Sequence, residues 1–81
     1  MRVWIRYFAS LREAAGVEGE TLELPDGASV GQARALLAER RPALATPLGP
    51  CMAAINQRYV SADTPLSAGD ELVFIPPLGG G

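Results

Sequence analysis

The architecture of this chain depends most on one stretch near its start, Arg2-Val3-Trp4-Ile5-Arg6-Tyr7-Phe8. Val3, Ile5 and Tyr7 recur at every second position and point one way, while the residues between them point the other way. This repeat is typical of a β-strand with one buried face. Residues 70–75 form a second such strand. These two strands are the most apolar in the chain, so we expect them to lie side by side at the centre of a sheet.

The longest helical pattern begins at Ser29. Ser29 and Gln32 have the spacing of a capping box, in which each residue satisfies a backbone amide of the other. Four apolar residues then recur at helical spacing and predict one buried stripe: Val30, Ala33, Leu36 and Leu37. Arg40 and Arg41 suit the negative end of the helix dipole, where we expect them to be solvated, and Pro42 ends the helix.

Shorter elements are predicted in the first third of the chain. Ser10 and Glu13 have capping-box spacing, with Ser10 accepting from the Glu13 amide, so a short helix should start there and end at Gly16 in the left-handed conformation. Residues 21–24 alternate as a second strand, which the turn at 25–27 ends.

The second half of the chain is predicted to be mostly strands and turns. A loop punctuated by proline and glycine covers residues 43–50, and a buried strand follows at 52–55. A turn at 56–58 leads to a returning strand at 59–60. Further turns are expected at 63–65 and 67–70. This order predicts an α+β domain of two layers, with one main helix packed on one face of a mixed sheet.

Composition excludes several classes of function. The chain has 81 residues, a length that corresponds to one domain. Its net charge of −2 gives no sign of a basic face that would bind nucleic acid. No segment approaches the roughly 20 apolar residues that span a bilayer. Cys51 is the only cysteine and there is no histidine, so one chain cannot build a Cys/His zinc site or a Cys–His dyad. We therefore expect a cytoplasmic protein with no metal site, no tightly bound cofactor and no activity of its own.

The end of the chain, Pro76-Pro77-Leu78-Gly79-Gly80-Gly81, carries the functional signal. Two prolines cannot join a sheet ladder and favour extended geometry, so they form a stiff base for the tail. Glycine has no Cβ, which lets a backbone enter a channel too narrow for side chains. We divide the chain into a folded domain, 1–77, and a flexible glycine-rich tail, 78–81.

A tail of this kind suits chemistry at the terminal carboxylate of Gly81. An α-carboxyl group has a pKa of about 3.5, so at neutral pH it is ionised and is a poor acyl donor. A partner enzyme could convert it to a mixed anhydride with AMP, which a sulfur nucleophile could then attack. The chain has no nucleotide-binding loop, so it cannot do this alone.

Several segments, in order and at matching spacing, resemble the small subunit of molybdopterin synthase, a ubiquitin-like sulfur-carrier family. The segments are 8–16, 55–57 with 59–60, 64–66, 69–71, and 74–77 followed by Gly80 and Gly81. The resemblance covers nearly the whole chain. Its most specific part is the Pro-Pro pair four residues before the final two glycines.

The resemblance implies a β-grasp, ubiquitin-like fold and a mechanism. An ATP-dependent activating enzyme would adenylate Gly81, and a sulfur donor would convert it to a thiocarboxylate. Residues Pro76, Pro77, Leu78, Gly79 and Gly80 would then insert with Gly81 into the large, catalytic subunit, where the sulfur passes to cyclic pyranopterin monophosphate. Two small and two large subunits would form the working complex. Gly79 stands where relatives often carry serine or alanine.

The sheet pattern also predicts where partners bind. Trp4, Phe8 and Ile75 should face away from the helix, and Tyr59 should join them on an exposed apolar face, unless the 43–50 segment covers it. By resemblance, Arg12 is expected to pair with an acidic group of the activating enzyme. Three alternatives stay open at this point: a carrier for thiamine synthesis or tRNA thiolation, a protein modifier conjugated through Gly81, and a plain interaction module.

Overall fold

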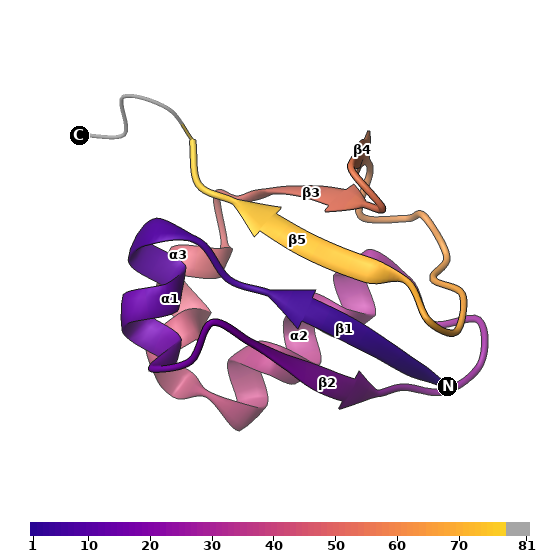
Figure 1. The fold of residues 1–81 in the computed structure, drawn as a ribbon, viewed down its shortest axis with the longest axis horizontal. Coiled ribbons are helices and arrows are strands. Elements are labelled where there is room, and N and C mark those ends of the chain that lie inside the picture. Colours follow the sequence, from indigo (N-terminus) through magenta and orange to yellow (C-terminus); the bar gives the residue numbers. More distant parts are fainter. Residues whose placement is uncertain (78–81) are drawn as a thin grey trace.

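A computed structural model describes residues 1–77 of the chain as a single mixed sheet with helices on one side. Figure 1 shows the arrangement. The elements follow one another in this order: β1 Arg2–Arg6, α1 Ala9–Ala15, β2 Gly19–Glu23, α2 Val30–Arg40, the 3-10 helix η1 Pro42–Leu44, α3 Ala45–Leu48, β3 Met52–Ile55, β4 Arg58–Val60 and β5 Glu71–Ile75.

The sheet has the strand order β2-β1-β5-β3-β4. β1 and β5 are parallel neighbours at its centre, with Ile5 opposite Leu72, and the other pairs are antiparallel. The prediction that the two most apolar strands lie side by side is therefore confirmed. The end of β5 lies near α1, and Met1 lies at the opposite end of the sheet (Figure 1).

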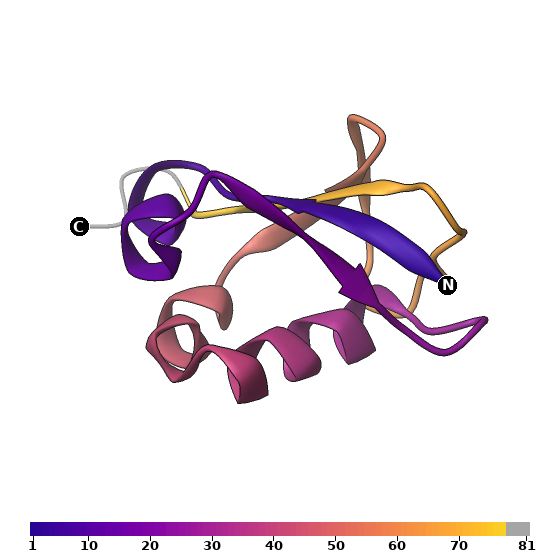
Figure 2. The same cartoon turned by 60° about the horizontal axis from the view of Figure 1, so that its bottom comes forward.

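The hydrophobic core fills the space between the sheet and the helices. Figure 2 shows α2 and α3 on the same side of the sheet. Alternate residues of β1 and β5 point into this core, and the largest fully buried side chains are Tyr7, Phe74, Ile5, Leu11, Leu22, Leu37, Leu44, Leu48 and Leu72. Within residues 1–77, the other side of the sheet carries no helix (Figure 2), so the two-layer architecture is confirmed.

The main helix starts as its sequence predicts. The Ser29 hydroxyl accepts from the Gln32 amide at 3.2 Å, and the Gln32 side chain accepts from the Ser29 amide at 2.7 Å. Val30, Ala33 and Leu37 are buried, and Leu36 packs partly buried against them. The helix ends at Arg40, before Pro42.

The predicted start of the first helix is wrong. α1 begins at Ala9, its N-cap is Phe8, and no side chain caps it. Ser10 lies within the first turn, because the extended backbone of Phe8 continues from β1 and the chain turns at Ala9 with φ of 49°. The Phe8 carbonyl accepts from the Leu11 amide at 3.0 Å. The predicted end is confirmed, since Gly16 has φ of 78° and its amide donates to the Arg12 carbonyl.

The loop predicted at 43–50 is also wrong, because most of it is helical. It contains part of η1 and all of α3, and it buries Leu44 and Leu48 against the core. Pro42 is the first residue of η1, and Pro47 lies in the single turn of α3. Proline is tolerated in the first turn of a helix, where its missing amide would have no partner. The prolines therefore do not prevent helix formation here.

Arg41 is not the solvated cap that its position predicts. Its Nε donates to Glu20 Oε2 at 2.7 Å, and its Nη1 donates to the Ala15 carbonyl at 2.9 Å. The Tyr7 hydroxyl donates to the same carboxylate at 2.6 Å. Burial alone would raise the pKa of Glu20, but hydrogen bonds from Arg41 and Tyr7 outweigh it and lower that pKa. Burial, and then the bond to Glu20, raise the pKa of Tyr7. The cluster joins the end of α2 to α1, β1 and β2.

Candidate functional site

The predicted reactive residue, Gly81, lies outside the described residues, as do Leu78, Gly79 and Gly80. The structure does place the base of this segment. β5 ends at Ile75, Pro76 is half-buried and Pro77 is exposed. Both prolines follow the last ladder residue, as their missing amides require. The boundary set between residues 77 and 78 stays a prediction.

A pocket of about 270 Å³ lies on the open face of the sheet and ends beside this base; we call it the open-face pocket. Its floor is formed by Ala54 and Val73, which are buried although they face away from the helices. Six side chains surround the floor: Arg6, Phe8, Gln57, Tyr59, Glu71 and Ile75. The short side chain of Ala54 leaves the depression, because its neighbours in the sheet are larger.

The rim of the open-face pocket combines aromatic and charged groups. Phe8 is 44% exposed and Tyr59 is 66% exposed. The Arg6 guanidinium lies over the Phe8 ring, 5.2 Å from its centroid, and pairs with Glu71 at 3.7 Å. Apolar floor and polar rim are the arrangement typical of protein interfaces. The segment 43–50 lies on the other side of the sheet, with the helices, and does not cover this pocket (Figure 2).

Three of the four predicted contact residues therefore meet in one place. Phe8, Tyr59 and Ile75 line the open-face pocket, but Arg12 does not. Trp4 is also on the open face. Its indole ring lies over Gly19 of the neighbouring strand β2, and Trp4 does not line the pocket. The other five residues of the pocket were not predicted from the sequence: Arg6, Ala54, Gln57, Glu71 and Val73. The short Asn-Gln turn between two strands was the signal that could have drawn attention to Gln57.

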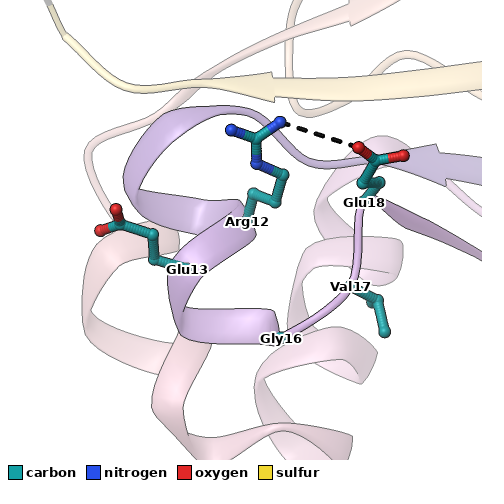
Figure 3. Close-up of a pocket in the computed structure, with 5 residues that line it drawn as sticks. All are labelled: Arg12, Glu13, Gly16, Val17 and Glu18. Carbon is teal, nitrogen blue, oxygen red and sulfur yellow. Dashed lines mark ion pairs between the residues drawn. The ribbon is translucent and has the colours of Figure 1, made fainter.

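Arg12 lines a second, larger cavity of about 330 Å³ at the turn between α1 and β2. Figure 3 shows its side chain and that of Glu18 pointing toward one another, and the ion pair between them is 3.9 Å long. Glu13 and Val17 point away from this pair (Figure 3). Both partners of the pair are largely exposed, so it contributes little to stability. The side chains do not converge on a common point, and the cavity offers no arrangement for catalysis.

The described residues hold few groups suited to catalysis or metal binding. Burial raises the pKa of the Cys51 thiol, whose Sγ lies 3.1 Å from the Pro47 carbonyl, so this thiol is a poor nucleophile. Within residues 1–77, no three acidic, cysteine or histidine side chains are placed to hold a metal ion. No helix in the same residues is long and apolar enough to cross a membrane.

Similarity to known proteins identifies the family. The ThiS family matches residues 5–81. The chain belongs to the ThiS family. The molybdopterin synthase sulfur carrier subunit of Chlamydomonas reinhardtii is 42% identical over 83 residues, with all of both chains covered. The subunit of the same name from Escherichia coli (strain K12) is 38% identical over 79 residues, covering 95% of this chain and 96% of the relative.

Solved structures of similar proteins share the fold. SAMP1 (small archaeal modifier protein 1) from Haloferax volcanii has a TM-score of 0.89 at 27% identity, with all of both chains covered. Subunit 1 in a complex with subunit 2 of the molybdopterin-converting factor from Helicobacter pylori 26695 has a TM-score of 0.74 at 29% identity, again with full coverage. The ubiquitin-like β-grasp fold and the resemblance drawn from the sequence are confirmed.

Proposed function

We propose that this chain is the sulfur carrier subunit of molybdopterin synthase and that Gly81 carries the sulfur. The observation that carries the proposal is the full-length match, at 42% identity, to a sulfur carrier subunit of that enzyme. The path of the backbone supports it, because β5 leads directly through Pro76 and Pro77 to the glycine-rich segment.

The chemistry takes place in three steps at the terminal carboxylate. An activating enzyme transfers AMP from ATP to this group and releases pyrophosphate. A sulfur donor then supplies a nucleophile that displaces AMP and leaves a thiocarboxylate. In the large subunit the thiocarboxylate sulfur forms a bond to cyclic pyranopterin monophosphate, and water then cleaves the acyl–sulfur bond, so that the carrier leaves as a carboxylate. Two such transfers supply the two sulfurs of the dithiolene. The carrier itself holds no cofactor in this scheme; ATP belongs to the activating enzyme and sulfur is the covalent cargo.

The length of the tail limits where the large subunit can bind. Residues 78–81 span at most about 13 Å when fully extended. The reaction centre of the large subunit must therefore come within that distance of Pro77, and its surface must cover the end of β5. The open-face pocket begins at this point with Ile75 and Phe8. We propose that the large subunit binds there. The similar structure from Helicobacter pylori, a complex of subunits 1 and 2 of the molybdopterin-converting factor, supports a partner of this kind.

Intact-mass measurement tests the carrier function. The protein is incubated with its activating enzyme, ATP and a sulfur source, and we expect a mass gain equal to one oxygen-for-sulfur exchange. The matched control lacks Gly81 and should gain nothing. An unchanged mass under conditions that load the Escherichia coli relative would contradict the proposal. Addition of the large subunit and pyranopterin should then yield the dithiolene product; failure at this step alone would favour delivery to thiamine or tRNA.

The similarity to SAMP1 favours a second candidate, a protein modifier joined to lysines of targets through Gly81. Both functions need an activated carboxylate, but only a modifier forms stable adducts. Mass spectrometry of trypsin-digested cell proteins would find residues 59–81 joined through Gly81 to target lysines if this function operates, because Arg58 is the last tryptic site of the chain. A cytoplasmic location stays a prediction and fits both candidates.

A further inference from the structure

The turn between β3 and β4 holds two residues in the left-handed conformation. Asn56 has φ of 48° and Gln57 has φ of 73°. Two-residue hairpin turns of this kind require positive φ at both positions and therefore favour Asn followed by Gly. A glutamine has a Cβ that is unfavourable in this conformation. The second position thus carries a residue that the turn itself does not favour.

Hydrogen bonds explain why Asn56 occupies the first position. Its amide donates to the Glu71 carbonyl at 2.9 Å, and its side-chain oxygen accepts from the Glu71 amide at 2.9 Å. Its side-chain nitrogen donates to Asp70 at 3.0 Å. Asn56 therefore fixes the hairpin to the start of β5. Within residues 1–77, no such side-chain hydrogen bond involves Gln57, so the fold gains nothing comparable from this glutamine.

The Gln57 side chain instead forms part of the rim of the open-face pocket. Beside it, Arg6 and Glu71 pair with one another across the rim. The Gln57 amide is exposed and offers both donors and an acceptor. A side-chain amide next to the apolar floor of Ala54 and Val73 is suited to a partner that inserts an apolar side chain and presents backbone polar groups around it.

We propose that Gln57 is a partner-contact residue, retained in an unfavourable backbone conformation because its side chain binds the large subunit of molybdopterin synthase. This inference rests on the proposed function. The tail requires that partner to cover Ile75, at one end of the pocket. Ile75 and Glu71 are four residues apart on β5, about 13 Å, and Gln57 lies at the Glu71 end. A partner that fills the pocket from the tail therefore reaches Gln57.

Two substitutions separate the side chain from the backbone. Gln57→Gly removes the whole side chain, including the Cβ that makes positive φ unfavourable. Gln57→Ala removes the amide group but keeps the Cβ. We expect Gln57→Gly to raise Tm by about 4 °C, because the relieved conformation outweighs the added freedom of glycine in the unfolded chain. Gln57→Ala should not raise Tm. Both should weaken binding of the large subunit from the same organism by about tenfold in calorimetry.

The outcomes distinguish the inference from the function on which it rests. If Gln57→Gly or Gln57→Ala binds the large subunit as tightly as the wild type, the contact role is wrong. If Gln57→Gly lowers Tm, the backbone conformation is not unfavourable for glutamine and the contact role loses its basis. Should Tyr59→Ala weaken binding while both Gln57 variants bind normally, the partner assignment survives and only this inference is overturned. Absence of binding by the wild type would overturn both.

Discussion

The two faces of the same sheet differ in what their side chains contact. On the covered face, residues such as Ile5, Leu72 and Phe74 are completely buried under the helices. On the open face, Trp4 is 42% exposed and other aromatic side chains surround a pocket with a small floor. β5 supplies both faces in alternation, so a slip of one residue in its register would exchange them.

The covered face therefore stabilises the fold, and the open face of the same sheet is available to bind a partner. The covered face gains free energy from apolar burial, at roughly 25 cal/mol per Å² removed from water. The open face leaves comparable apolar groups exposed, which costs solubility and is typical of a surface that a partner covers. Substitutions on the covered face should therefore lower the free energy of unfolding, and those on the open face should lower affinity.

The largest effect is expected from Leu37→Ala, in the C-terminal half of α2 on the covered side. Leu37 is fully buried, so truncation removes apolar contact and leaves a cavity. We expect a loss of about 2–5 kcal/mol in the free energy of unfolding, measured by urea denaturation. A domain of this size has little stability to spare, so the variant should be partly unfolded at 37 °C.

Leu36→Ala is the matched control for this change, because Leu36 is the neighbouring residue and only partly buried. It should lose clearly less stability than Leu37→Ala. Equal losses for the two leucines would show that burial by the sheet does not determine stability here.

Tyr59→Ala tests the open face and should have the opposite profile. The side chain is 66% exposed and lies on the rim of the open-face pocket. We expect a change of less than about 0.5 kcal/mol in unfolding free energy. Affinity for the large subunit should fall about 30-fold or more, since exposed aromatic residues around a pocket commonly dominate binding. A large fall in Tm with normal affinity would reverse the roles of the two faces.

The sequence predicted the elements that local patterns determine. Alternation identified β1 and β5 as strands, and their apolar composition placed them at the centre of the sheet. The cap of Ser29 and the glycine at position 16 marked helix ends correctly. These signals involve residues a few positions apart. Phe8, Tyr59 and Ile75 were assigned to an exposed face for the same reason, and the structure brings them to one pocket.

Apart from the start of α1, a local error, the errors concern features that depend on contacts distant in the sequence. α3 has one turn, so its apolar residues could not be distinguished from a loop, and burial of Leu44 and Leu48 in the core stabilises it. Arg41 contacts Glu20, 21 residues away. The pocket floor at Ala54 exists only because other strands place larger side chains around it. No local pattern encodes these contacts.

Gly19→Ala tests how the open face packs at the edge of the sheet, and its expected loss of stability is smaller than that of Leu37→Ala. A Cβ at Gly19 would lie 2.6 Å from the Trp4 ring and 2.7 Å from the Ile5 carbonyl oxygen. The ring could move, but the backbone oxygen could not, so we expect a loss of about 1–3 kcal/mol. Fluorescence of Trp4, the only tryptophan, should change with it.

Gly49→Ala provides the control for that substitution. A Cβ at Gly49 would lie 3.4 Å from the Thr46 carbonyl, an ordinary contact, and the residue has helical φ and ψ. This variant should be as stable as the wild type or slightly more stable. If Gly49→Ala loses as much stability as Gly19→Ala, contact with Trp4 is not what destabilises the Gly19→Ala variant.

The smallest effect is expected from Glu20→Gln, measured against Glu23→Gln on the same strand. Glu20 points to the covered side and bonds Arg41 and Tyr7, whereas Glu23 pairs with Arg2 in solvent. At pH 7 we expect a loss of about 1 kcal/mol in unfolding free energy for Glu20→Gln and nearly none for Glu23→Gln.

This difference should depend on pH. The pKa of Glu20 is lowered in the folded state, so the stability that its carboxylate contributes is present above the unfolded pKa of 4.5 and is lost as pH falls through the lower, folded pKa. Urea denaturation between pH 7 and pH 3 should therefore show the wild type and Glu20→Gln converging in acid. A constant difference across that range would mean that the ionised carboxylate is not what stabilises the cluster.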